Sequence, residues 1–295
     1  MRGLATPFGL GLGLALGLLA AAGAARAADD AVARGQYLVR AGGCVSCHTA
    51  PGGTPFAGGR ALATPFGTFY SPNITPDPQT GIGKWSDADF QRALRQGIRP
   101  DGGHYFPVFP YPSFTGISDD DARAIKAYLF SLPPVGQPNR AHDVSFPFSW
   151  RFLQVGWRLL FFDEGPFMPD RRASPAYNRG AYLVTALAHC GECHTPRNFL
   201  GAVKDGQALS GNPDGPDGQI VPNITPDPKT GIGDWEKDDI ALLLKTGETP
   251  EHSKVKGAMR EAVEDGLKYL TDEDRLAIAE YLLAQKPVSN DVRRR

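Results

Sequence analysis

All four cysteines of this 295-residue chain lie in two groups of the form Cys-x-x-Cys-His, at residues 44–48 and 190–194. Two thiols three residues apart can each bond the same flat organic group. The imidazole that follows at once can offer a nitrogen to a metal at the centre of that group. Because no cysteine is left over, the sequence excludes a disulfide framework.

This spacing is the attachment pattern of c-type haem, in which the thiols bond the porphyrin vinyl groups and the histidine is the proximal iron ligand. A zinc site would need further Cys or His ligands close to each motif. A thioredoxin-like redox pair would not need the histidine. The sequence therefore predicts two covalently bound haem c groups. Their predicted site residues are Cys44, Cys47, His48, Cys190, Cys193 and His194.

The sequence around the motifs occurs twice. Residues 72–83 recur as residues 222–233 with one difference, Gln79 against Lys229, and a tryptophan follows each segment at the same distance. A period this long indicates two tandem copies of one domain rather than a solenoid. The organisation we expect is a signal peptide at 1–27, a first domain at 28–134, a connector at 135–171, a second domain at 172–290 and a tail at 291–295.

Each copy predicts a helix, the Cys-x-x-Cys-His motif, a long Pro/Gly loop, a short helix and a final helix. Ser118 and Thr271 each stand three residues before an aspartate, which is the pattern of a capped helix start. No run alternates with period two, so we expect at most incidental strands. The predicted fold class is all-α and loop-rich, with one haem at the centre of each domain.

The N-terminus predicts export. Arg2 is followed by an uncharged stretch rich in Leu, Ala and Gly, and residues 25–27 form an Ala-x-Ala cleavage site. The alternative is an uncleaved membrane anchor, because the uncharged stretch is long enough to span a bilayer. Removal of residues 1–27 would leave the mature chain in a bacterial periplasm. The net charge of −1 argues against a nucleic-acid partner.

Three parts of the chain resemble the tandem dihaem c-type cytochromes: residues 35–39 with 44–48, residues 73–83 with Trp85, and residues 189–198. These cytochromes are electron-transfer subunits of periplasmic alcohol and aldehyde dehydrogenases. The resemblance covers nearly the whole mature chain. It implies two all-α cytochrome c domains with no catalytic residues, a dehydrogenase as electron donor and a soluble cytochrome or terminal oxidase as acceptor.

The sixth iron ligands differ between the copies. Met259 lies between the last two helices of the second copy, where such cytochromes carry a distal methionine that raises the potential. The first copy has no methionine, and Phe109 stands where relatives often have one. Three arrangements remain open for the first haem: ligation by His104, ligation by Met168 from the connector, or an open iron.

An open iron would allow a different function. The first haem could then bind peroxide, nitric oxide or a sulfur anion, with the second haem supplying electrons, and the protein would be a haem enzyme. No nucleotide loop, other metal motif or nucleophile elbow is present in the sequence. We therefore expect an electron carrier rather than an enzyme, and keep the haem enzyme as the alternative.

The connector carries an aromatic cluster at residues 149–162. Its polar residues Arg151, Gln154 and Arg158 fall on one helical stripe. We expect the broad apolar face to pack between the two domains; the alternatives are docking to a partner enzyme or peripheral contact with a membrane surface.

Further expectations concern the remaining histidines, two prolines and the repeated loop segments. His189 is expected to pack internally, and His142 and His252 to face solvent. The carbonyls of Pro51 and Pro196, or of neighbours, are candidate acceptors for the proximal histidines. The repeated Asn-Ile-Thr-Pro segments either donate to haem propionates or form turns.

Overall fold

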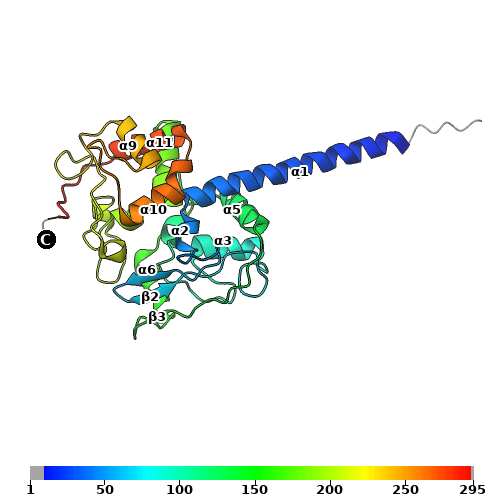
Figure 1. Cartoon of the computed structure of the whole chain (residues 1–295), viewed down its shortest axis with the longest axis horizontal. Coiled ribbons are helices and arrows are strands. Elements are labelled where there is room, and N and C mark those ends of the chain that lie inside the picture. Colours follow the sequence, from blue (N-terminus) through cyan, green and yellow to red (C-terminus); the bar gives the residue numbers. More distant parts are fainter. Residues whose placement is uncertain (1–9, 294–295) are drawn as a thin grey trace, which may run out of the picture.

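The computed structural model describes residues 10–293, which form a helical body from which one long helix projects (Figure 1). The elements of the first half are α1 (Leu10–Ala41), α2 (Cys44–Cys47), β1 (Ala61–Thr64), β2 (Gly67–Tyr70), α3 (Asp87–Gln96), α4 (Tyr111–Phe114) and α5 (Asp119–Ser131). Those of the connector are β3 (Asp143–Val144) and α6 (Leu153–Phe161).

The second half repeats the helical order of the first. Its α-helices are α7 (Pro175–Tyr182), α8 (Gly191–His194), α9 (Lys237–Thr246), α10 (Gly257–Asp265) and α11 (Asp272–Leu283). A π-helical turn and three 3₁₀ turns complete it: η1 (Leu183–Leu187), η2 (Asp205–Gln207), η3 (Pro216–Gly218) and η4 (Leu267–Tyr269).

In each half the first and last helices cross at a glycine. A Cβ atom on Gly35 of α1 would lie 1.9 Å from the carbonyl oxygen of Ala124 in α5. A Cβ atom on Gly180 of α7 would lie 1.9 Å from the carbonyl oxygen of Ala277 in α11. Such distances are far inside van der Waals contact, so only glycine lets the two backbones approach this closely. The crossing brings the apolar faces of the paired helices into one buried core.

The two final helices begin where the sequence predicts. The Ser118 hydroxyl accepts a hydrogen bond from the Asp121 amide at 3.2 Å, and the Thr271 hydroxyl accepts one from the Asp274 amide at 3.1 Å. Each cap satisfies one of the amides that a helix start leaves without a partner. Both helices then run for about three turns along the core.

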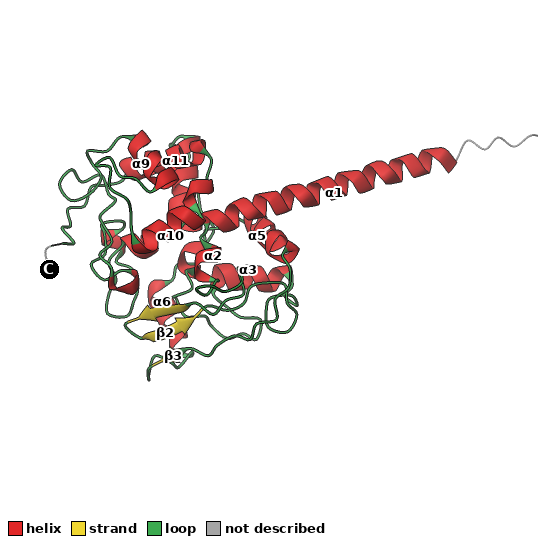
Figure 2. Cartoon of the chain, in the orientation of Figure 1, coloured by secondary structure: helices red, strands yellow, loops and turns green. Residues whose placement is uncertain are grey.

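A small antiparallel sheet departs from the expected all-α fold (Figure 2). Strand β2 pairs with β1, with Ala61 opposite Tyr70, and with β3, with Gly67 opposite Val144. The strands have four, four and two residues, too few for a period-two pattern to stand out in the sequence. Strand β3 also comes from the connector, so its pairing depends on the tertiary fold.

The N-terminal helix shows no break at the predicted cleavage site. Helix α1 runs continuously from Leu10 to Ala41, and its N-terminal part extends away from the body (Figure 1). Residues 1–9 of the predicted signal peptide lie outside the described residues. Among the described residues, no helix is both long and apolar enough to cross a membrane.

The connector helix packs with its polar stripe inward, which is the reverse of the expected orientation. Arg151 donates a hydrogen bond to the carbonyl oxygen of His104 at 2.9 Å, and Arg158 donates one to the carbonyl oxygen of Gln96. Gln154, between them on the stripe, is buried. The two guanidinium groups thus satisfy one loop carbonyl and one carbonyl at the C-terminus of α3 that would otherwise need water, and this decides which face turns inward.

The apolar face of α6 therefore remains on the surface. Leu159 is 84% exposed, and Leu160 and Phe152 are also exposed. Trp157, Phe161 and Phe162 are only partly exposed. Trp157 packs on Tyr111 of the first half, and its indole N–H donates to the carbonyl oxygen of Leu200 in the second half at 3.0 Å. The expectation that the apolar face packs between the two halves therefore holds for Trp157 and is wrong for the exposed residues.

The glycine crossing makes a testable prediction. Gly180→Ala should lower the free energy of unfolding by about 1–3 kcal/mol, the usual cost of overpacking, because the new methyl group meets the Ala277 carbonyl. Gly206→Ala is the matched control, since a Cβ atom there meets no atom within 4 Å. Denaturant unfolding of the full chain measures both. Equal midpoints for the two variants would contradict the crossing.

Candidate haem attachment sites

The first Cys-x-x-Cys-His motif is one turn of helix. Helix α2 begins after Gly43, whose φ of 62° is left-handed, and the His48 amide closes the turn on the Cys44 carbonyl at 2.9 Å. The His48 Nδ1–H donates to the carbonyl oxygen of Pro72 at 2.8 Å. A carbonyl can only accept, so the proton lies on Nδ1 and leaves the Nε2 lone pair free for a metal.

The second motif has the same geometry. The His194 amide donates to the Cys190 carbonyl at 2.9 Å, and its Nδ1–H donates to the carbonyl oxygen of Pro222 at 2.8 Å. The acceptors are therefore not Pro51 and Pro196 but the prolines that begin the repeated Pro-Asn-Ile-Thr-Pro segments. That equivalence was visible in the sequence as a repeat, but nothing in the repeat said that its first carbonyl faces the histidine.

Buried polar side chains hold each acceptor proline in place. The Asn73 amide donates to the Val135 carbonyl at 2.7 Å, and the Asn73 carbonyl oxygen accepts from the Thr75 amide at 2.9 Å. Both side chains are almost fully buried. In the second half, Asn223 donates to the Val288 carbonyl at 2.7 Å. These amides donate to a threonine hydroxyl in their own loop and to a carbonyl in the segment that follows the last helix of their half, so their donors hold the loop in place.

The protonation states suit covalent haem attachment. Burial lowers the pKa of His48 and His194, and the hydrogen bond to each proline opposes it only in part, so each imidazole is neutral at pH 7. Burial raises the pKa of Cys44 and Cys190 to about 12, which keeps these thiols protonated. All four cysteines are free of disulfides. Unpaired thiols beside a neutral imidazole with a free Nε2 fit a covalently bound haem at each motif.

The residues just before the two motifs are in contact. His189 stands directly before the second motif, and its Nε2–H donates to the carbonyl oxygen of Gly42, just before the first, at 3.3 Å. Burial raises the pKa of Cys193 to about 11, the Glu192 carboxylate adds to the shift, and Cys47 is close enough to contribute as well. His189 is internal, as expected. The direct contact between the motifs was not predicted.

Helix α10 also contacts the first motif. The Ser46 hydroxyl donates to the Asp265 carboxylate at 3.1 Å, and Arg60 forms an ion pair with Glu261 at 2.8 Å. Because α10 carries Met259 in its first turn, the same short helix serves both halves. Met259 is partly buried and packs against the apolar core, as a distal ligand or a core methionine would.

The residues considered for the distal side of the first haem differ in exposure and in hydrogen bonding. Met168 is 77% exposed, so the arrangement in which it crosses over to the first haem is wrong. His104 lies in an isolated bridge with Ile98, and its Nδ1 is buried without a hydrogen-bond partner. Phe109 is partly buried and packs against the core.

The two other histidines behave differently from each other. His252 is exposed beside Glu248, as expected. His142 is not solvent-facing: its Nδ1 accepts from the Tyr70 amide at 3.2 Å, and its ring packs on Phe69 and Phe106. The pairing of β2 with β3 brings it there, so the sequence alone offered no signal.

A reciprocal hydrogen-bond network joins the halves. The Tyr182 hydroxyl donates to Asp121 at 2.6 Å, and the Tyr37 hydroxyl donates to Asp274 at 2.5 Å, so each tyrosine reaches the aspartate of the other half. Arginines complete both sites: Arg34 Nε donates to Asp121 at 2.8 Å and Arg179 Nε to Asp274 at 2.8 Å. Burial raises the pKa of both phenols, so each remains a protonated donor.

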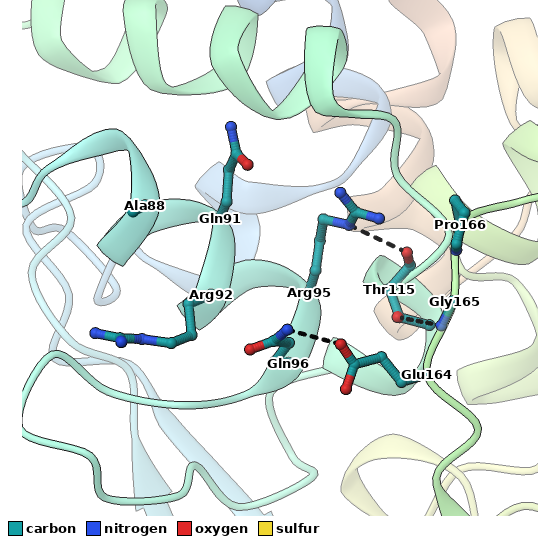
Figure 3. A pocket seen from close by; sticks show the side chains of 9 residues that line it. All are labelled: Ala88, Gln91, Arg92, Arg95, Gln96, Thr115, Glu164, Gly165 and Pro166. Atoms are coloured by element: carbon teal, nitrogen blue, oxygen red, sulfur yellow. Dashed lines mark hydrogen bonds between the residues drawn. The ribbon is translucent and has the colours of Figure 1, made fainter.

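A polar cleft of about 590 Å³ lies between α3 and the end of the connector (Figure 3). Gln96 donates to the Glu164 carboxylate at 2.7 Å, and Arg95 donates to the Thr115 carbonyl at 3.3 Å. These contacts fasten residues 164–166 across α3. The cleft is thus built from internal pairs, and neither Cys-x-x-Cys-His motif lines it.

The comparisons with known proteins agree with the geometry. A model of the cytochrome c family matches residues 32–133. A protein named diheme cytochrome c-type, from Cereibacter sphaeroides, is 44% identical over 256 residues, which cover 84% of this chain and 84% of that protein. The chain belongs to the cytochrome c family.

Other relatives are subunits of larger enzymes. The gluconate 2-dehydrogenase cytochrome c subunit of Pantoea cypripedii is 43% identical over 277 residues, 90% of this chain. The cytochrome c subunit of alcohol dehydrogenase (quinone) from Gluconobacter oxydans is 42% identical over 288 residues, 94% of this chain. The chain spans 63% of the first relative's length and 60% of the second's.

The reciprocal network predicts a pH-dependent stability. Burial acts to raise the pKa of Asp274, but hydrogen bonds from Arg179 and Tyr37 and the charge of Arg179 outweigh it and lower the pKa below 3.8. A lowered folded pKa stabilises the native state above the unfolded value, and that stability disappears as the pH falls through the folded pKa.

Asp274→Asn should therefore lose about 1.5–3 kcal/mol of unfolding free energy at pH 7, since hydrogen bonds to a buried charge are lost. The difference from the parent should shrink below about pH 4. Glu273→Gln, at the exposed neighbouring position, is the control. Denaturant unfolding at several pH values measures the effect, and a pH-independent difference would argue against the assignment.

Proposed function

We propose that this protein is a dihaem c-type cytochrome that carries electrons from a periplasmic dehydrogenase to a downstream cytochrome or terminal oxidase. One haem would be bound by Cys44, Cys47 and His48, and the other by Cys190, Cys193 and His194. In this proposal residues 1–27 direct export, residues 28–134 and 172–290 form the two cytochrome c domains, and residues 135–171 connect them.

One observation carries the proposal: each motif histidine is held by the same 2.8 Å hydrogen bond to a loop proline, with Nε2 left free. A bound haem would supply a one-electron redox centre at each motif. The protein's own residues would orient the imidazoles and keep them neutral.

The contact between the motifs supports electron transfer within one molecule. The bond from His189 to Gly42 joins the residues that stand just before the two attachment motifs, at the interface of the halves. Because the reciprocal Tyr–Asp bonds fix that interface, the separation of the two redox centres would vary little.

The partners are inferred from the relatives. Several are named as cytochrome c subunits of gluconate, alcohol and fructose dehydrogenases. We infer a dehydrogenase as electron donor here and no substrate chemistry in the chain itself. The alternative of a haem enzyme gains no support from these relatives.

Removal of one thiol pair tests the haem count. Cys44→Ser with Cys47→Ser, and Cys190→Ser with Cys193→Ser, should each leave one covalent haem instead of two, because each haem depends on its own pair of thioether bonds. The pyridine haemochrome assay and the intact mass of the exported protein measure this. Two haems remaining in either double variant would contradict the attachment sites.

The distal ligand of the second haem is Met259 in this proposal. Met259→Ala should abolish the far-red sulfur-to-iron absorption band and lower the reduction potential of that haem, since a thioether ligand stabilises ferrous iron. The covalent haem content should not change. Met168→Ala is the matched control, because its exposed side chain contacts no haem site. An unchanged spectrum in Met259→Ala would refute the ligand assignment.

A further inference from the structure

Phe109 and Met259 occupy matching positions in the two halves. Residue numbers in the loops after α3 and α9 differ by 150: Ile98 bridges His104 in one, and Glu248 bridges Lys254 in the other. The next amide in each loop also bonds back to the glycine that caps the preceding helix, at 2.8 Å and 2.9 Å. Five residues beyond each bridge stand Phe109 and Met259.

The two side chains have similar surroundings but different chemistry. Both are partly buried and pack against the apolar core. The Phe109 ring contacts Tyr105 at 5.5 Å and Phe114 at 5.8 Å between ring centroids, and Phe114 in turn contacts His189 beside the second motif. A phenyl ring has no lone pair to give to iron, whereas a thioether has one.

No other side chain of the first half takes over this position. His104 corresponds to Lys254, which lies on the exposed side of its turn and pairs with Glu248 at 2.9 Å. The His104 carbonyl accepts a hydrogen bond from Arg151 of the connector at 2.9 Å, which holds the backbone of this residue in place. Met168 is exposed in the connector.

We propose that the haem site at residues 44–48 has no protein ligand on its distal side and that its iron binds a small neutral diatomic molecule there. This inference rests on the proposed attachment of haem to that motif. The ligand class follows from the side chain that stands in place of the methionine: Phe109 is apolar and packs on the rings of Tyr105 and Phe114, so burial of an anion against it would be costly. Carbon monoxide is the probe for this class.

The experiment titrates carbon monoxide into the reduced, haem-loaded full chain. One molecule should bind per two haems, and the oxidised protein should show one high-spin and one low-spin ferric signal. Phe109→Met should abolish carbon monoxide binding and add a second far-red sulfur-to-iron band. Met259→Phe, the reciprocal variant, should raise uptake to two molecules.

The variant His104→Ala tests whether His104 is the distal ligand of the first haem. Carbon monoxide uptake should be unchanged in this variant if the iron is open, although the Nδ1 of His104 is buried without a partner. A parent protein with two low-spin haems and no uptake overturns the inference, and uptake gained only in His104→Ala names histidine as the ligand.

Counting the covalent haems first, by the pyridine haemochrome assay, distinguishes failure of the open-site inference from failure of the proposed function. Two covalent haems without carbon monoxide binding refute the open site and leave the electron carrier standing. Absence of covalent haem refutes the carrier itself. If Phe109→Met does not fold, the titration of the parent chain still decides.

Discussion

The structure depends on one hydrogen bond made twice, from the Nδ1–H of a motif histidine to a proline carbonyl. It selects the tautomer, aims Nε2 away from the loop and sets the ring plane. The proline is itself fixed by the buried Asn and Thr side chains that follow it. A change in those loops would therefore alter the orientation of the histidine that we propose as the iron ligand, without contacting it.

The contact between the halves also uses one repeated set of residues twice. Tyr37 donates to Asp274 of the second half, and Tyr182 donates to Asp121 of the first. The repeated sequence therefore supplies both sides of the interface. The phenols stay protonated because burial raises their pKa, and an arginine forms an ion pair with each carboxylate. This interface determines how far apart two redox centres would stand.

Because the sequence repeats, a difference between corresponding positions of the two halves is informative. Equivalent bridges and capping glycines precede Phe109 and Met259 at the same distance in the two halves. Beyond the bridge the backbones differ, because Met259 lies in the first turn of α10 and Phe109 lies in a turn before α4. A side chain that could bind iron thus stands in one half and one that cannot stands in the other. The second half thus serves as an internal reference for the first.

Local patterns in the sequence determined the attachment motifs, the capped helix starts at Ser118 and Thr271, and the internal repeat, because each depends on residues within one turn or one loop. The tertiary structure alone decided the proline acceptors, the small sheet, the buried place of His142 and the contact between the motifs. It also decided that α6 turns its polar stripe inward, because the acceptors for Arg151 and Arg158, His104 and Gln96, are distant in sequence. Amphipathic periodicity identifies two faces of a helix, but only the partners available in the folded chain determine which face is buried.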